Sequence, residues 1–164
     1  MYDIDFNIKG QLQLHVRKFL LYPEFWISEE NLVGIVLDWQ QKKFTNENVA
    51  DIPEEKGLYC FVVKPEVPNF FETKYLFYIG QTKRTLRIRY GEYLSDQRGV
   101  GKPRNKIYEM LNLYRNNIYF YYAKIANADI IEENEEKLLN TFMPAINTKI
   151  PKARILPELK NIYE

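Results

Sequence analysis

One glutamate stands where an amphipathic helix is expected to be apolar. A helix over residues 129–142 would carry Ile131, Leu138 and Phe142 on one face, and Glu135 falls in the middle of that stripe. An ionised carboxylate that faces a core costs free energy unless it is paired or bound to a metal. Two interpretations stay open at this point: a structural ion pair with an arginine, or Mg²⁺, for which one carboxylate suffices when substrate phosphate and water complete the shell.

Two tyrosines stand beside glycines in segments rich in aromatic and β-branched residues. Tyr59 follows Gly57 by two positions, and Tyr78 precedes Gly80 by two. Strands favour tyrosine on packing grounds alone, so the simplest interpretation is a pair of core residues in a hairpin. The alternative is that the two phenols face a phosphate.

Positive charge is concentrated between residues 83 and 106. This segment holds eight basic and two acidic residues, although the net charge of the chain is only +1. Such a stripe is typical of a surface that contacts phosphates, with a solvated helix face as the alternative. The cations that we expect to contact nucleic acid are Lys83, Arg84, Arg87, Lys102, Arg104 and Lys106.

Composition excludes several classes of protein. The chain of 164 residues is 46% hydrophobic and 15% aromatic, which favours one compact domain, alone or with an extension. A single cysteine, Cys60, excludes a disulfide framework and a thiolate metal site. A single histidine excludes a histidine dyad and a zinc site built from histidines. We see no apolar run long enough to cross a bilayer and no signal-like start, so we expect a soluble, cytoplasmic protein.

The elements that must position these residues follow from periodicity and punctuation. Strands are expected at 57–64, from about 74 to 80, and at 118–125, and helices at 85–95, 105–115 and 129–142. Thr85 and Asn105 are the expected helix caps. The order β-β-α-α-β-α predicts an α+β domain with a small antiparallel three-stranded sheet flanked by helices.

We divide the chain into an N-terminal extension (1–50), a domain (51–150) and a C-terminal tail (151–164). The extension is expected to be partly helical, with a helix that Ser28 caps and that runs to about Lys43. It holds five basic and seven acidic residues, which suits a packing element or dimer surface better than a DNA contact.

In combination, four elements resemble the GIY-YIG nuclease family over roughly residues 52–148. Gly57-Leu58-Tyr59 is similar to the first signature, with Leu for Ile, and Tyr78-Ile79-Gly80 matches the second. The stretch from Gly80 to Arg89 is similar to the family's turn into a helix that bears its essential arginine. The segment from Glu135 to Asn147 is similar to the family's metal-binding segment. In both, the glutamate is followed by an aliphatic pair, an aromatic residue, a proline and an asparagine.

The resemblance implies hydrolysis of a nucleic-acid phosphodiester with Mg²⁺ or Mn²⁺ as cofactor. It implies catalytic roles for Tyr59, Tyr78, Arg89, Glu135, Tyr93 and Asn147, with Glu135 as the metal ligand. Tyr59 would be the general base, provided that a metal or a lysine lowers its pKa. Arg89 would hold the phosphate oxygens, and Asn147 would fix the last helix or the first strand.

Three features depart from the family pattern. The two signature tyrosines are 19 residues apart, a longer spacing than in many members. Tyr93 stands where many members carry histidine, and Gln81 stands at a position that is sometimes lysine.

The first expectation is a DNA endonuclease of restriction or mobile-element type, acting on duplex DNA as a monomer or homodimer. The alternatives are a catalytically idle nucleic-acid-binding module and a subunit of a larger nuclease or defence complex.

Overall fold

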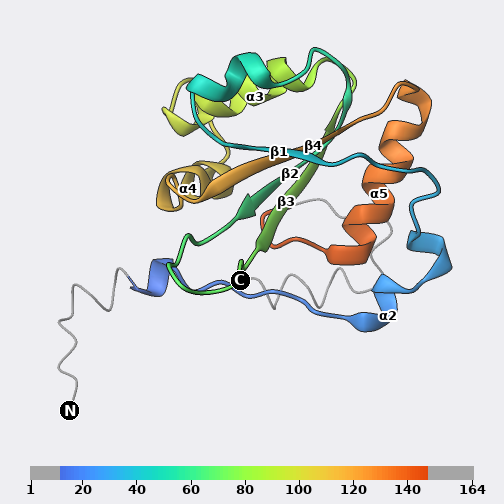
Figure 1. Cartoon of the computed structure of the whole chain (residues 1–164), viewed down its shortest axis with the longest axis horizontal. Helices are drawn as coiled ribbons and strands as arrows, with labels where there is room; N and C mark the ends of the chain where they lie inside the picture. The colour runs from blue at the N-terminus through green and yellow to red at the C-terminus, as the bar shows by residue number, and fades with distance from the viewer. Residues whose placement is uncertain (1–11, 148–164) are drawn as a thin grey trace.

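The computed structural model describes residues 12–147, which form a mixed α+β structure around one antiparallel sheet (Figure 1). Its strands are β1 Gln40–Lys43, β2 Gly57–Val63, β3 Tyr75–Thr82 and β4 Ile118–Lys124, in the spatial order β1-β4-β2-β3. The predicted α+β class is confirmed. The predicted count of three strands is wrong, because β1, from the stretch that we assigned to the extension, pairs with β4.

The helix predicted from Ser28 to Lys43 is also wrong. The structure has a 3₁₀ turn, η1 (Glu29–Asn31), then extended chain that leads into β1. Apolar residues in this stretch fit a helical period and a period of two equally well. The period of two prevails because Ile35, Leu37 and Trp39 pack against buried residues of the sheet and the last helix, whereas Val36 is 98% exposed.

Helices cover both faces of the sheet (Figure 1). On one face lie α3 (Leu86–Gln97) and α4 (Asn105–Leu113), and on the other lies α5 (Ile131–Phe142). The remaining elements are short: α2 Pro23–Trp26 and the 3₁₀ helices η2 Glu47–Asp51 and η3 Ala128–Ile130. No helix within residues 12–147 is long and apolar enough to cross a membrane.

Strand β2 divides its side chains between these two layers. It lies between β3 and β4, and all seven of its residues are buried. Tyr59 and Phe61 join the cluster formed with α3 and α4, whereas Leu58 and Cys60 face the side of α5. This alternation, which follows from the pleat of a strand, places Tyr59 opposite α3.

The helix ends follow the sequence signals in part. Thr85 is the N-cap of α3, and its hydroxyl accepts a hydrogen bond of 3.1 Å from the backbone N–H of Ile88, as predicted. Asn105 does not cap α4, since the N-cap position is Arg104 and no side chain bonds there. Helix α5 ends at Phe142, and its C-cap Met143 has a left-handed φ of 42°, just before Pro144.

Asn147 joins the segment after α5 to the free edge of β3. Its Nδ2 donates to the carbonyl of Ile79 at 2.7 Å, and its Oδ1 accepts from the N–H of Ile79 at 3.0 Å. The side chain thus satisfies the outward-facing backbone groups of an edge strand. The expectation that Asn147 fixes an element by hydrogen bonds is met at β3 rather than at the first strand or the helix.

We expect Asn147→Ala to lower the free energy of unfolding by about 1–3 kcal/mol, because it leaves both backbone groups of Ile79 without partners. Urea denaturation measures this loss. Asn116→Ala is the matched control, since Asn116 is exposed, and it should change the midpoint little. Equal midpoints for the two variants would show that the edge does not need the amide.

Candidate active site

The two signature tyrosines lie side by side on the α3 side of the sheet. Tyr59 is directly opposite Gly80 in the β2–β3 register, and the Tyr59 and Tyr78 rings are stacked with centroids 6.3 Å apart. The Tyr59 ring crosses the backbone of Gly80 so closely that a Cβ there would lie 2.5 Å from both Cζ and Oη of Tyr59. Glycine is therefore required at residue 80 to let the phenol occupy this position.

Gly80→Ala should lower the free energy of unfolding by about 1–3 kcal/mol, because the packed Tyr59 ring must be displaced. The matched variant is Gly91→Ala within α3, where an added Cβ meets nothing within 4 Å. That change should raise stability by about 0.5–1 kcal/mol through helix propensity. Thermal unfolding of both variants tests this. A Gly80→Ala protein as stable as the parent would contradict the close approach.

Helix α3 brings an arginine and a third tyrosine to the same place. Arg89 and Tyr93 are four residues apart and share one helix face. Arg89 donates from Nε to the Tyr59 hydroxyl at 3.0 Å and from Nη2 to the Tyr93 hydroxyl at 3.2 Å. Its Nη1 pairs with Glu92 at 2.6 Å. Three side-chain contacts therefore fix the guanidinium, whose side chain is still 26% exposed.

A second arginine reaches the tyrosines from the loop before α4. Arg104 donates to the Tyr93 hydroxyl at 3.3 Å and approaches the Tyr78 hydroxyl at 3.4 Å. The loop turns at Gly99 and Gly101, whose φ values of 74° and 77° favour glycine. Arg89 and Arg104 thus converge on one hydroxyl, with Glu92 as the carboxylate paired to Arg89.

The hydrogen bonds determine which way the hydroxyl protons point. Tyr93 accepts from both arginines, which fills its two lone pairs, so its proton is directed to Tyr59 across 2.9 Å. Tyr59 then accepts from Tyr93 and from Arg89. Within the described residues no acceptor is left for the proton of Tyr59, whose residue is only 1% exposed.

Burial makes Tyr59 a poor base. Loss of solvent, reinforced by Tyr78, raises the pKa of the Tyr59 phenol to about 12, although Arg89 and Tyr93 oppose the shift. Burial also raises the pKa of Tyr93 well above its usual value. The role of general base that the resemblance gives to Tyr59 needs a lowered pKa, and the protein groups around it act in the opposite direction.

Glu135 lies on α5, across the sheet from the tyrosines. Lys83 at the end of β3 pairs with Glu132 at 3.0 Å, and Asn147 binds Ile79, so α5 and its C-terminal segment run beside the end of this edge strand. Glu135 is one turn beyond Glu132. Within residues 12–147 it forms no ion pair with an arginine, so the first of the two interpretations of this carboxylate, a structural ion pair, is not met there.

Glu135 is half-buried, and its carboxyl group holds a proton more tightly than usual. Burial, with a smaller contribution from the negative charge of Glu132, raises its pKa from 4.5 to about 7. A strand beside α5 offers a buried amide oxygen. Gln81 lies opposite Leu58 in the register, so its side chain faces the α5 layer, and its buried Oε1 has no hydrogen-bond partner among residues 12–147.

The Glu135 carboxylate and the Gln81 amide oxygen are donors of the kind that a hard divalent cation prefers, but two protein ligands do not complete its coordination shell. Carboxylate and amide oxygens are the donors that Mg²⁺ and Mn²⁺ accept, and Mg²⁺ commonly binds one carboxylate while keeping water and phosphate ligands. No group of three or more His, Cys, Asp or Glu within residues 12–147 is arranged to hold a metal ion. The protein would therefore hold the metal only together with substrate and water.

The predicted cationic stripe is divided by ion pairing. Lys83, Arg84 and Arg87 pair with Glu132, Glu92 and Glu54 at 3.0, 2.6 and 2.6 Å. Arg87 also donates to the carbonyls of Ala50 and Ile52, which makes it a structural clamp on the chain before β2 rather than a solvent-facing cation. Lys102, Arg104 and Lys106 form no ion pair with a described residue, so the cations without a counter-ion lie in the loop before α4 and its first turn.

Two residues at the site were missed by sequence reasoning. Glu92 pairs with both Arg89 and Arg84, and only its spacing of three from Arg89 on a helix could have indicated this. Gln81 was noted only as a departure from the family pattern, and its burial in a strand edge was not visible in the sequence.

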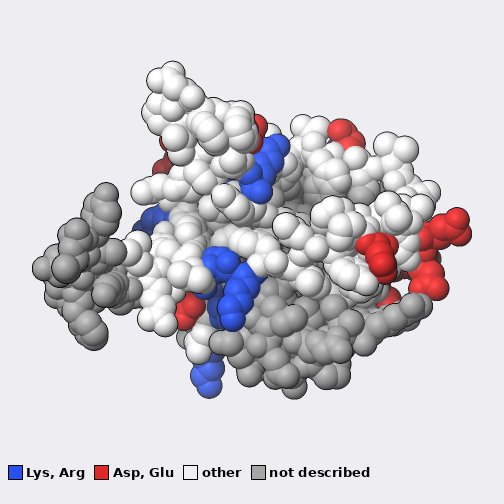
Figure 2. Space-filling view, turned by 90° about the horizontal axis from the view of Figure 1, so that it is seen from below, with Lys and Arg blue, Asp and Glu red and all other residues white. Residues whose placement is uncertain are grey.

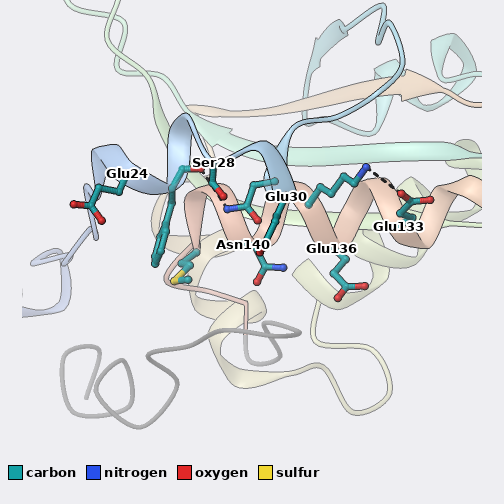
Figure 3. A pocket seen from close by; sticks show the side chains of 10 residues that line it. Glu24, Ser28, Glu30, Glu133, Glu136 and Asn140 are labelled. Atoms are coloured by element: carbon teal, nitrogen blue, oxygen red, sulfur yellow. Dashed lines mark hydrogen bonds and ion pairs between the residues drawn. The ribbon is translucent and has the colours of Figure 1, made fainter.

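A separate hollow lies between α2, η1 and α5, away from the tyrosines (Figure 3). Its volume is about 410 Å³, and Glu24, Glu30, Glu133 and Glu136 line it. Lys137 is the one cation among its described lining residues, and it pairs with Glu133 at 3.0 Å. The described lining therefore offers a polynucleotide no cation without a counter-ion.

Comparison with protein-family models, with curated proteins and with solved structures finds no match to this chain.

Proposed function

We propose that this protein is a metal-dependent DNA endonuclease of the GIY-YIG type, with the tyrosine–arginine cluster (Tyr59, Tyr78, Tyr93, Arg89, Arg104) as its phosphate-binding site. The observation that carries the proposal is the convergence of Arg89 and Arg104 on the Tyr93 hydroxyl, 3.2 and 3.3 Å away. The two guanidiniums of Arg89 and Arg104 outnumber the one carboxylate, Glu92, that is paired to Arg89, so the site favours the binding of an oxyanion.

An edge strand lets both faces of the sheet contribute to one site. β3 is the last strand in the order β1-β4-β2-β3, and Ile146 and Asn147 cover its edge at Phe77 and Ile79. A strand of DNA at the uncovered end of this edge, near Gln81, would meet Tyr78 from one face and Glu135 from the other. Asn147 binds the backbone N–H and carbonyl of Ile79, so these groups face the outer edge of β3. Every second residue of a strand directs its backbone groups to the same edge, so the N–H and carbonyl of Gln81 face outward as well. The N–H of Gln81 would then donate to a phosphate oxygen.

The residues take the following roles in hydrolysis. Arg89 neutralises the charge that develops on the phosphate, with Arg104 beside it. Tyr59, which is only 1% exposed, positions Arg89 through its hydroxyl at 3.0 Å, and the high pKa of its phenol disfavours the role of a base. Glu135, assisted by Gln81, would hold the divalent cation, which supplies a bound water of lowered pKa and positive charge at the phosphate.

The function is tested with supercoiled plasmid, the full-length protein, and Mg²⁺ or Mn²⁺. We expect nicked and linear products that disappear with a chelator, and sequencing of the ends would give any site preference. Binding that weakens with salt, without cutting under either metal, would favour the alternative of a nucleic-acid-binding module, which would keep the cationic surface.

A further inference from the structure

The N-terminal part of the chain places cations beside the start of α4. A hollow of about 270 Å³ is lined by Val16, Arg17, Lys18, Lys106, Glu109 and Ile146, together with Ala145. Three of these residues are basic and one is acidic. Lys18 and Lys106 are exposed and form no ion pair with a described residue.

Arg17 is held in place rather than free in solvent. Its Nε donates to the Tyr114 hydroxyl at 3.1 Å, and its guanidinium lies 5.7 Å from the centre of that ring. Tyr114 follows α4 directly and packs against the main hydrophobic core. The cationic hollow is therefore lined by one arginine held by a tyrosine and by two exposed lysines.

This hollow continues from the tyrosine–arginine cluster. Lys106 is two residues beyond Arg104, which contacts Tyr78. On the other wall, the N–H of Ile146 binds the carbonyl of Phe77, the neighbour of Tyr78, at 3.3 Å. The cluster and the hollow thus share both the start of α4 and the edge of β3.

Charge is distributed unequally over this side of the molecule. Figure 2 shows Lys and Arg in the middle of the face, while Asp and Glu gather at the edge on the side where α2 lies in Figure 1. Glu24 of α2 and Glu133 of α5 line the hollow between these two helices. A polyanion seated at the cluster is therefore attracted toward residues 17, 18 and 106 and repelled from the α2 side.

We infer that Arg17, Lys18 and Lys106 form a second phosphate-binding surface that holds the DNA backbone next to the bond to be cut. The inference rests on the proposed function for the identity of the polymer. It assigns the extension a DNA contact, the role that its charge balance favoured less than packing or dimer formation, since residues 17 and 18 would then bind phosphates. These contacts go to phosphates, so they set register and affinity rather than sequence preference.

The test is the salt dependence of binding to a 30-base-pair DNA duplex in the presence of Ca²⁺. The full-length protein is compared with Lys18→Gln/Lys106→Gln and with the matched control Lys42→Gln/Lys124→Gln, whose lysines pair with Asp51 and Glu55 elsewhere on the surface. The slope of log K against log salt concentration should fall in magnitude by about 1.8 for the first variant, from about 0.9 per phosphate. The control should keep the parent slope.

Folding and charge are separated by two further measurements. Thermal unfolding should give the same midpoint for both double variants, and Lys18→Arg/Lys106→Arg should restore the parent slope. A Lys18→Gln/Lys106→Gln protein that binds with the parent slope overturns the inference, even if the parent cuts DNA. A parent that binds with the expected slopes but never cuts supports this surface while overturning the proposed nuclease. A parent that neither binds nor cuts overturns both.

Discussion

Replacing Arg89 with alanine is expected to lower the rate of DNA cleavage by about 10²–10³-fold, the usual loss when one donor to a developing oxyanion is removed. Arg89 is also the one side chain that contacts Tyr59, Tyr93 and Glu92 together, at 3.0, 3.2 and 2.6 Å. The measurement is the cleavage rate with enzyme in excess over plasmid.

Lysine should not replace Arg89, because one ammonium group cannot reach all three partners that the guanidinium holds. Arg98→Ala is the matched control. Arg98 lies at the end of the same helix, and its nearest partners are Asn46 and Ser95 at 3.5 and 3.3 Å. Cleavage by Arg89→Lys at the parent rate would contradict the forked geometry, and a loss in Arg98→Ala equal to that in Arg89→Ala would mean that charge alone is needed.

Replacing Glu135 with glutamine should abolish metal-dependent cleavage and, without metal, stabilise the protein at alkaline pH. Burial raises the pKa of this carboxyl group from 4.5 to about 7. Between these values the unfolded chain has released the proton while the folded protein retains it, so stability falls as pH rises from about 4.5 to about 7. The amide carries no such proton, so the variant should show a smaller fall in thermal midpoint between pH 5 and pH 8.

The same proton governs the metal. A divalent cation binds the deprotonated carboxylate, so its apparent affinity should rise about tenfold per pH unit up to pH 7 and then level off. Cleavage at limiting Mg²⁺ should follow that curve. Glu133→Gln is the matched control, because Glu133 is on the exposed side of α5 in a pair with Lys137. If metal affinity does not change between pH 6 and pH 8, Glu135 is not the ligand.

The hairpin and the helices were predictable because local signals agreed with one another. Buried β-branched and aromatic runs defined β2 and β3, and Thr85 with an apolar period of 3.6 defined α3. The placement of Glu135 within an apolar stripe predicted a carboxylate that faces the core, and Glu135 is half-buried. Of the two interpretations offered for it, the ion pair with an arginine is not formed within residues 12–147, and the Mg²⁺ site stays a prediction. Helix period alone was sufficient to predict the burial.

The strand β1 and the position of Arg104 were not predictable from local pattern. β1 is the short, polar run Gln40-Gln41-Lys42-Lys43, and only its pairing with β4 makes it a strand. Arg104 was expected to contact nucleic acid. Its approach to Tyr78 and Tyr93 depends on the path of the loop that turns at Gly99 and Gly101, and the sequence does not specify that path. Ion pairing of Lys83, Arg84 and Arg87 likewise depends on which carboxylates the fold brings near.

The most direct test of the account is the cleavage rate of supercoiled plasmid under enzyme excess, measured with Mg²⁺ for the parent and for Glu135→Gln. We expect cutting by the parent, none in chelator, and none by Glu135→Gln, although that variant should fold and bind DNA. Equal rates for the two proteins, or cutting by the parent in chelator, would contradict a metal-dependent site at Glu135.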